Sequence, residues 1–148
     1  MPETPIIHMQ KLSVGSVSIE SLAEWQKHVA IVRAQEGLPA FADHITRMSP
    51  KRKEEILAGG SIFWVIKGVL QCRNRIIDLQ ETFTSDGRKA CRIVLAPELV
   101  AVVPTPKRAF QGWRYLKYGD APKDISSLEG AADLPAHLRT KLVDIGAW

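Results

Sequence analysis

The 148-residue chain has no long apolar run and none of the short motifs that mark common catalytic sites. Its longest apolar runs, such as residues 62–66, are far too short to span a membrane. The opening MPETPIIHMQK lacks the basic start and apolar stretch of a secretory signal. With 45% hydrophobic and 24% charged residues, the composition supports one ordinary core. We therefore expect a single globular domain over residues 1–148, located in the cytoplasm.

Nucleotide-binding and hydrolase fingerprints are missing from the sequence. There is no G-x-S-x-G elbow, Walker loop or G-x-G-x-x-G pattern. The glycine pair Gly59-Gly60 follows a predicted helix, whose carboxyl end has the wrong polarity for phosphate. Motifs therefore assign no catalytic residue, no metal ligand and no cofactor, and the oligomeric state stays open.

Only two cysteines, Cys72 and Cys91, are present. Both fall in predicted strands joined by a turn at Asp86-Gly87, which places Cys91 opposite Thr82. Cys72 would then lie about ten residues, or roughly 33 Å, further along the strand. At that separation we expect no disulfide unless the strands bend back sharply, and two thiols without matching histidines do not make a zinc site. We expect two buried thiols.

Helical signals occur in three places. Ser18 is a typical N-cap, Gly37 a typical stop, and apolar residues between them recur at helical spacing. Ser49-Pro50 predicts the start of a short helix over residues 51–58, and a last helix is expected over residues 135–145. The predicted buried face of the first helix consists of Leu22, Trp25, Val29 and Val32.

Extended segments dominate the middle of the chain. Residues 62–66 are apolar on both faces, which indicates a central buried strand. Asp86-Gly87 predicts a hairpin, and Pro97 is expected to end a strand. The other predicted strands cover residues 6–12, 41–48, 70–79, 91–95 and 99–103, followed by a stiff basic linker (104–108) and a surface loop (117–130). This order favours an α+β fold with a small, bent, mixed or antiparallel sheet, or a pseudo-barrel, flanked by helices.

Positive charge is concentrated in the middle of the chain. The net charge is +4 and the isoelectric point about 9.2. Residues 44–114 carry a net +7, against −2 before them and −1 after them. Such an asymmetry suits a polyanion such as nucleic acid, although an ordinary solvated basic surface explains it equally well.

Two groups of side chains are candidate ligand contacts. Gln71, Arg73 and Arg75 alternate along one strand and would share a face that tracks phosphates. The segment FQGWRYL follows Lys107 and Arg108 and combines aromatic rings with hydrogen-bonding groups. Its candidate residues are Gln111 to read a base edge, Trp113 and Tyr115 to stack on a base, and Arg114 to hold a phosphate.

Asp43-His44 is the only pairing that suggests acid–base chemistry. Neighbouring strand residues point to opposite faces, so the two side chains are poorly placed for a mutual hydrogen bond. A structural role for His44 is therefore favoured. Arg47, two positions beyond Ile45, is a further candidate phosphate contact.

A resemblance along essentially the whole chain rests on four short motifs: HITRM, PKR, GGSIFWVIKG and FQGWRYL. The chain resembles a bacterial family of domains of unknown function, number 1489. The family supplies no activity, so the resemblance transfers no catalytic residue.

A second resemblance concerns topology. Residues 44–79 resemble the core of the PUA-like superfamily, especially its EVE and ASCH branches, in which a strand, a short helix, a glycine and a buried aromatic strand follow one another. That resemblance implies a small pseudo-barrel that binds RNA or modified bases. The chain departs from the EVE pattern, because Gly60-Ser61 stands where Gly-Asp is usual.

These observations predict a non-enzymatic module that binds RNA or a nucleotide-like anionic ligand. Arg47, Arg73, Arg75 and Arg114 would converge on phosphates around aromatic rings. The alternatives are a small enzyme acting on an anionic metabolite, with His44 as acid–base and Arg47 or Arg114 as anion clamp, and a protein-interaction subunit that uses the acidic ends of the chain.

Overall fold

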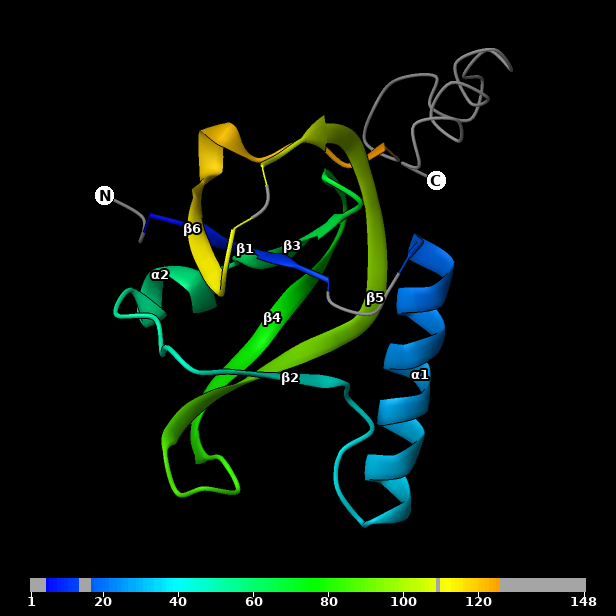
Figure 1. Ribbon diagram of the computed structural model, residues 1–148, viewed down its shortest axis with the longest axis vertical. Helices are drawn as coiled ribbons and strands as arrows, with labels where there is room; N and C mark the ends of the chain where they lie inside the picture. Colours follow the sequence, from blue (N-terminus) through cyan, green and yellow to red (C-terminus); the bar gives the residue numbers. More distant parts are fainter. Residues whose placement is uncertain (1–4, 14–16, 109, 126–148) are drawn as a thin grey trace.

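The computed structural model describes residues 5–13, 17–108 and 110–125 (Figure 1). The predicted helix over residues 135–145 lies outside these residues. No helix in the described part is long and apolar enough to cross a membrane. In chain order the elements are β1 (Ile7–Leu12), α1 (Ile19–Gln35), β2 (Asp43–Thr46), α2 (Lys53–Leu57), β3 (Ser61–Ile66), β4 (Val69–Phe83), β5 (Lys89–Pro106), β6 (Trp113–Lys117) and the 3-10 turn η1 (Tyr118–Asp120).

The described strands form one mixed, open six-stranded sheet in the order β2-β5-β4-β3-β1-β6. β1 and β3 run parallel, and every other neighbouring pair is antiparallel. Because the strands cluster without regular helix alternation, this is the predicted α+β arrangement with a mixed sheet. Every residue of β3 is buried, as the apolar run 62–66 predicts.

The sheet curls until its two edges approach each other. The indole N–H of Trp113 in β6 donates to the carbonyl of Met48, 2.7 Å away, just after β2. The backbone N–H of Arg52 donates to the hydroxyl of Tyr115 at 3.1 Å. β6 and β2 are opposite edges of the sheet, so these bonds link the edges without strand pairing.

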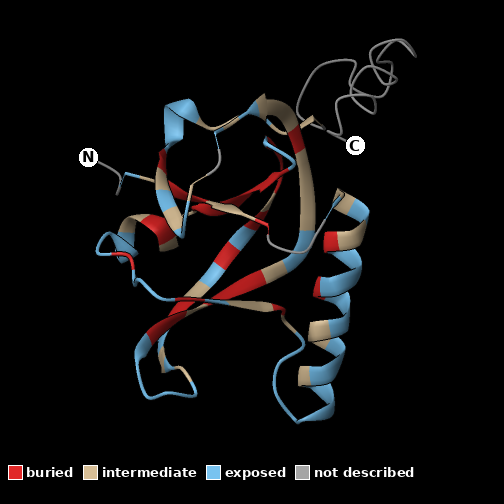
Figure 2. Ribbon diagram, viewed as in Figure 1, coloured by how far each residue is buried: buried red, intermediate tan, exposed pale blue. Residues whose placement is uncertain are grey.

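Each face of the sheet has its own apolar cluster. One cluster contains Trp64 and Met9 and packs against Leu22 of α1 and Ile56 of α2. The other contains Phe63 and Leu116 and has no helix residue in it. Both helices therefore cover the same face (Figures 1 and 2).

A buried amide network fixes α1 to the sheet. Gln26 and Asn74 exchange reciprocal side-chain hydrogen bonds of 2.8 and 2.9 Å. Asn74 also accepts from the Trp64 indole at 2.9 Å and donates to the Ala96 carbonyl at 3.1 Å. A buried polar network of this kind is stable only when its members are paired, and here Asn74 provides the common partner.

Helix α1 begins as predicted but presents a different face. The Ser18 hydroxyl accepts from the N–H of Ser21, which confirms the N-cap. The helix buries Leu22 and Gln26, whereas Trp25 is 49% exposed. The predicted face Leu22–Trp25–Val29–Val32 is therefore wrong for Trp25 and Val32, because Gln26 enters the core to bond Asn74.

Three further boundaries differ from the sequence prediction. Helix α2 starts after Arg52 without a side-chain cap, so Ser49-Pro50 does not begin it. Pro97 does not end a strand: β5 passes through it where its register with β4 shifts, a position that tolerates a missing N–H. The expected linker residues 104–106 belong to β5 as well. The observed hairpin register differs from the predicted one by one residue, because Cys91 pairs with Glu81 instead of Thr82. Cys72 and Cys91 are both free and buried.

Gly60 should be the least replaceable glycine of the described chain. A Cβ at this position would collide with the carbonyl oxygen of Ile7 and lie 2.7 Å from that of Ile56. Since both partners are backbone, we expect Gly60→Ala to lower the free energy of unfolding by about 2–3 kcal/mol or more. Urea denaturation measures the free energy of unfolding of each variant. Gly119→Ala, which meets no atom within 4 Å, is the control, and equal stability of the two variants would contradict the packing argument.

Candidate ligand-binding site

The predicted site residues divide between two hollows. Arg73 and Arg75 line one of about 490 Å³. Arg47, Gln111 and Trp113 line another of about 480 Å³. We call them the His8 pocket and the Trp113 pocket. The His8 pocket is lined by His8, Gly59, Ser61, Phe63, Arg73, Arg75, Tyr118, Gly119, Ala121, Pro122, Lys123 and Asp124. The Trp113 pocket is lined by Lys11, Ile45, Thr46, Arg47, Met48, Gln111, Gly112 and Trp113.

The two pockets open on opposite faces of the sheet. Phe63 pairs across the strands with Arg73, and Trp64 pairs with Lys11, which in turn pairs with Trp113. Cross-strand partners share a face, whereas Phe63 and Trp64 are neighbours in β3 and point to opposite faces. The prediction that Arg47, Arg73, Arg75 and Arg114 converge on one side is therefore wrong: Arg73 and Arg75 line one pocket and Arg47 lines the other.

Two predicted contact residues have partners elsewhere. The Arg114 guanidinium lies over the ring of Phe110, 5.3 Å from its centroid. The Tyr115 ring packs edge-on against Trp113 at 4.8 Å, and its hydroxyl receives the Arg52 N–H. Strand alternation in β6 places Arg114 on the face opposite to both rings. Gln71 is fully buried and donates to the Ile66 carbonyl, so of the three residues expected to track phosphates, Gln71 does not face a ligand.

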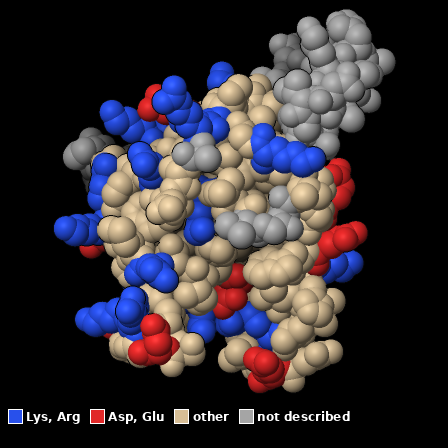
Figure 3. All heavy atoms as spheres, viewed as in Figure 1, with Lys and Arg blue, Asp and Glu red and all other residues tan. Residues whose placement is uncertain are grey.

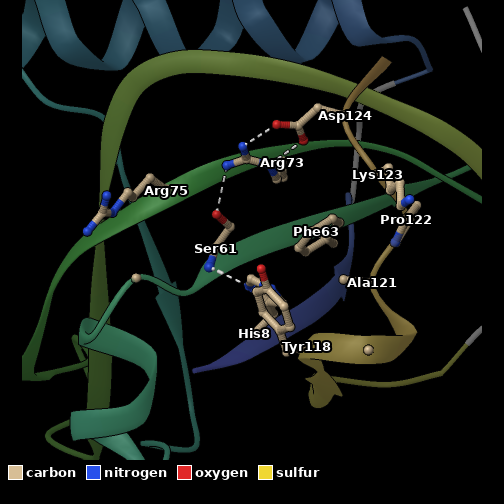
Figure 4. A pocket seen from close by; sticks show the side chains of 12 residues that line it. His8, Ser61, Phe63, Arg73, Arg75, Tyr118, Ala121, Pro122, Lys123 and Asp124 are labelled. Atoms are coloured by element: carbon tan, nitrogen blue, oxygen red, sulfur yellow. Dashed lines mark hydrogen bonds and ion pairs between the residues drawn. The ribbon is translucent and has the colours of Figure 1, made fainter. Parts of the chain in front are cut away.

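The His8 pocket lies between the sheet and a covering segment. Its floor comes from alternate residues of β1, β3 and β4, and its cover is the chain from Tyr118 to Asp124 (Figure 4). The cover returns beside β5, where Val102 and Asp124 form an isolated bridge and the Val103 N–H donates to the Lys123 carbonyl. The cover begins with η1 and continues as an extended segment, and the hollow lies between this segment and the sheet.

Arg73 joins the cover to the floor. Its guanidinium donates to both oxygens of the Asp124 carboxylate, at 2.7 and 2.6 Å, and to the Ser61 hydroxyl at 3.0 Å. The bond to Asp124 raises the pKa of Arg73 further. Bidentate pairing of this kind fixes both distance and orientation. Arg73 therefore positions the cover, and its charge is already balanced.

His8 is a neutral hydrogen-bonding group. It is only 7% exposed, and its Nδ1 accepts the Ser61 N–H at 2.9 Å. Burial and the nearby Arg73 lower the pKa of His8 to about 4, against the opposing effect of Asp124. The remaining ring proton is therefore assigned to Nε2. The ring stacks on Tyr118 with centroids 5.7 Å apart and meets Phe63 edge-on at 4.9 Å.

The groups that remain for a ligand are two cations and a ring. Arg75 and Lys123 lie at opposite ends of the view in Figure 4, with Ser61, Phe63 and His8 between them. Neither forms an ion pair with another described residue. Tyr118 is 66% exposed, so its ring is accessible to solvent. The pocket thus combines separated positive charges with an aromatic surface.

His44 is not arranged as half of a catalytic dyad. The Asp43 carboxylate binds Arg33 at 2.6 Å and Arg92 at 3.0 Å, while the His44 ring meets Trp64 edge-on at 5.4 Å. Burial and Lys11 lower the pKa of His44 to about 4, although Asp43 opposes them. Adjacent strand residues face opposite ways here, as predicted. In the described ranges, no cluster of three or more His, Cys, Asp or Glu residues could hold a metal ion.

Sequence reasoning missed His8, Phe63, Tyr118 and Lys123. His8 has a local signal, because it and Gln10 alternate with Ile7 and Met9 and so share one face of a buried strand. Residues 117–130 were expected to be a surface loop, and no local pattern shows that Tyr118–Asp124 covers β3. The Arg73–Asp124 pair, 51 residues apart, is likewise invisible in the sequence.

The described residues define an α+β fold with an aromatic, partly cationic pocket under a segment that Arg73 bonds to the sheet. Residues 9–148 match the model of the family described as "Protein of unknown function (DUF1489)", and the chain belongs to that family. No curated protein and no solved structure matches it significantly.

The low pKa of His8 predicts acid sensitivity. An unfolded histidine takes up a proton near pH 6.5, whereas folded His8 does so only near pH 4. The free energy of unfolding should therefore fall as the pH is lowered through this window, with a contribution from His8 on the order of 2 kcal/mol. His8→Asn keeps an acceptor for the Ser61 N–H and cannot titrate. Denaturant titrations at pH 7 and pH 4.5 should show a smaller loss in this variant; an equal loss would mean that His8 is not the titrating group.

Proposed function

We propose that the protein is a non-enzymatic module that binds single-stranded RNA, or another ligand containing a nucleobase and phosphates, in the His8 pocket. The observation that carries this proposal is the placement of Arg75 and Lys123 on either side of the ring pair His8–Tyr118. Single strands are commonly bound by cationic grooves that contain aromatic platforms.

The dimensions of the pocket support a base-sized ligand. A hollow of about 490 Å³ lies within the usual range for small-molecule sites, about 300–1,000 Å³. A base would stack on the exposed Tyr118 ring. The His8 and Tyr118 rings are already in contact, so the base would take the free side of Tyr118. The Nε2–H of His8 can donate to a base or sugar oxygen.

The positive charges of the His8 pocket favour a nucleic-acid strand over a single phosphate as the ligand. Arg75 and Lys123 are separated across the pocket, and Arg73 is occupied by Asp124. Two separated cations match successive phosphates of a strand better than one compact anion. On the face shown in Figure 3, basic side chains gather on the side of β6 and α2 and at the β4–β5 hairpin, whereas acidic ones lie mainly along α1, so the two sides of this face differ in charge.

The PUA-like relationship is part of the proposal. β2, α2, Gly60, β3 and β4 follow one another in the order that the resemblance requires, and hydrogen bonds link the edges of the curled sheet. The alternative of an enzyme using His44 has weaker support. Two charges act on the His44 ring: Lys11 lowers its pKa and Asp43 raises it. The ring contacts Trp64, and no described carboxylate forms a hydrogen bond with it.

Removing the Tyr118 ring should weaken RNA binding. Stacking contributes about 1–3 kcal/mol per base, so Tyr118→Ala should raise the Kd for a labelled single-stranded RNA at least about fivefold. Tyr118→Phe keeps the ring and should bind nearly normally. Phe83→Ala removes another exposed ring, at the distant hairpin, and is the matched control. Fluorescence anisotropy gives the three constants, and equal losses for the positions 118 and 83 would rule out specific stacking.

Arg75 should contribute one phosphate contact. The logarithm of the affinity for single-stranded RNA falls by roughly 0.7 per log unit of salt for each phosphate neutralised. Arg75→Gln should reduce this slope by about that amount. Arg88→Gln, which changes the same charge in the exposed hairpin, should leave the slope unchanged. A wild-type affinity that does not respond to salt, or no binding at low salt, would refute the RNA proposal.

A further inference from the structure

We infer that the Trp113 pocket is a second ligand site, which takes an oxyanion, a carboxylate or a phosphate, attached to a planar or apolar body. This site lies on the opposite face from the His8 pocket, and the inference does not depend on RNA binding.

The first observation is unbalanced positive charge. Lys11 and Arg47 both line the pocket, and no acidic residue lines it. In the described residues neither cation forms an ion pair. The pKa of Asp86 is lowered chiefly by the hydrogen bond from Thr84 and only slightly by Arg47, so this carboxylate lies within electrostatic range of Arg47 but forms no ion pair with it. Two cations therefore line a hollow that contains no carboxylate, and an oxyanion bound there would balance their charge.

Of the two cations, Lys11 is the one that is partly buried. It lies in β1, paired with Trp64 on one side and Trp113 on the other, so strand alternation directs it toward the helix-covered face. Burial lowers its pKa, which shows that the ammonium group has lost part of its hydration. A half-buried ammonium without a carboxylate partner gains more from a bound anion than an exposed one does.

The walls of the pocket are apolar and fixed in place. The Trp113 indole N–H is held by the Met48 carbonyl at 2.7 Å, so the ring cannot swing away from the pocket. Met48 and Ile45 are 72% and 43% exposed, and both line the hollow. Gln111 adds an amide that can donate to or accept from the ligand. These features suit a ligand whose anionic head meets the cations while its flat or apolar body contacts Trp113, Met48 and Ile45.

The test uses phenyl phosphate and benzoate as probes of the full-length protein. The Trp113 indole N–H signal is followed in ¹H–¹⁵N spectra and assigned by its loss in Trp113→Phe. We expect a saturable shift with at least one probe and no comparable shift with sodium chloride at equal ionic strength. A response to phenyl phosphate alone identifies a phosphate site, and a response to benzoate alone identifies a carboxylate site. No saturable shift with either probe overturns the inference.

Variants separate this site from the His8 pocket. Arg47→Gln should weaken probe binding about tenfold or more, because a charge-assisted hydrogen bond is lost. Arg47 is exposed, so the variant should fold normally. Arg75→Gln removes an exposed arginine from the opposite face and should bind the probes as the wild type does. Equal weakening by Arg47→Gln and Arg75→Gln would overturn the inference. Loss of RNA binding in Arg75→Gln bears only on the proposed function.

Discussion

The burial of β3 on both faces is the constraint from which the rest of the structure follows. All six of its residues are buried, and Phe63 and Trp64 belong to separate apolar clusters. A strand with two apolar faces requires cover on both sides. The two described helices cover only the Trp64 side. On the Phe63 side, the segment Tyr118–Asp124, which begins with η1, lies over the sheet and leaves a cavity against it.

This arrangement explains the different roles of chemically similar residues. Arg73 fixes the covering segment to the sheet through its bonds to Asp124 and Ser61. Arg75 is two positions along the same strand and has no such partner in the described residues. One arginine therefore holds the structure together, and the next is available to a ligand. On the other face, the Trp113–Met48 bond links the sheet edges and, by the same contact, forms a pocket wall.

The sequence predicted features that depend on local physics. The Ser18 cap, the buried β3 and the hairpin at Asp86-Gly87 each follow from a few neighbouring residues. Errors arose where a distant contact overrides a local preference. Gln26 turns α1 toward Asn74, which leaves Trp25 exposed, and a register shift lets β5 pass through Pro97. The candidate site followed the same rule: alternation correctly related Arg73 to Arg75, but no local pattern brings Tyr118 and His8 together.

Counting charges along the chain overstates the positive potential available to a ligand. Arg33 and Arg92 are bound to Asp43, Arg73 to Asp124, and Arg52 to Glu55. Burial also keeps His8 and His44 neutral at pH 7, because it lowers the pKa of each to about 4. The cations that line the pockets without an ion-pair partner in the described chain are Arg75 and Lys123 on one face and Lys11 and Arg47 on the other. Since each face holds its own pair, the unpaired positive charge is divided between two separate hollows and does not form one broad basic surface.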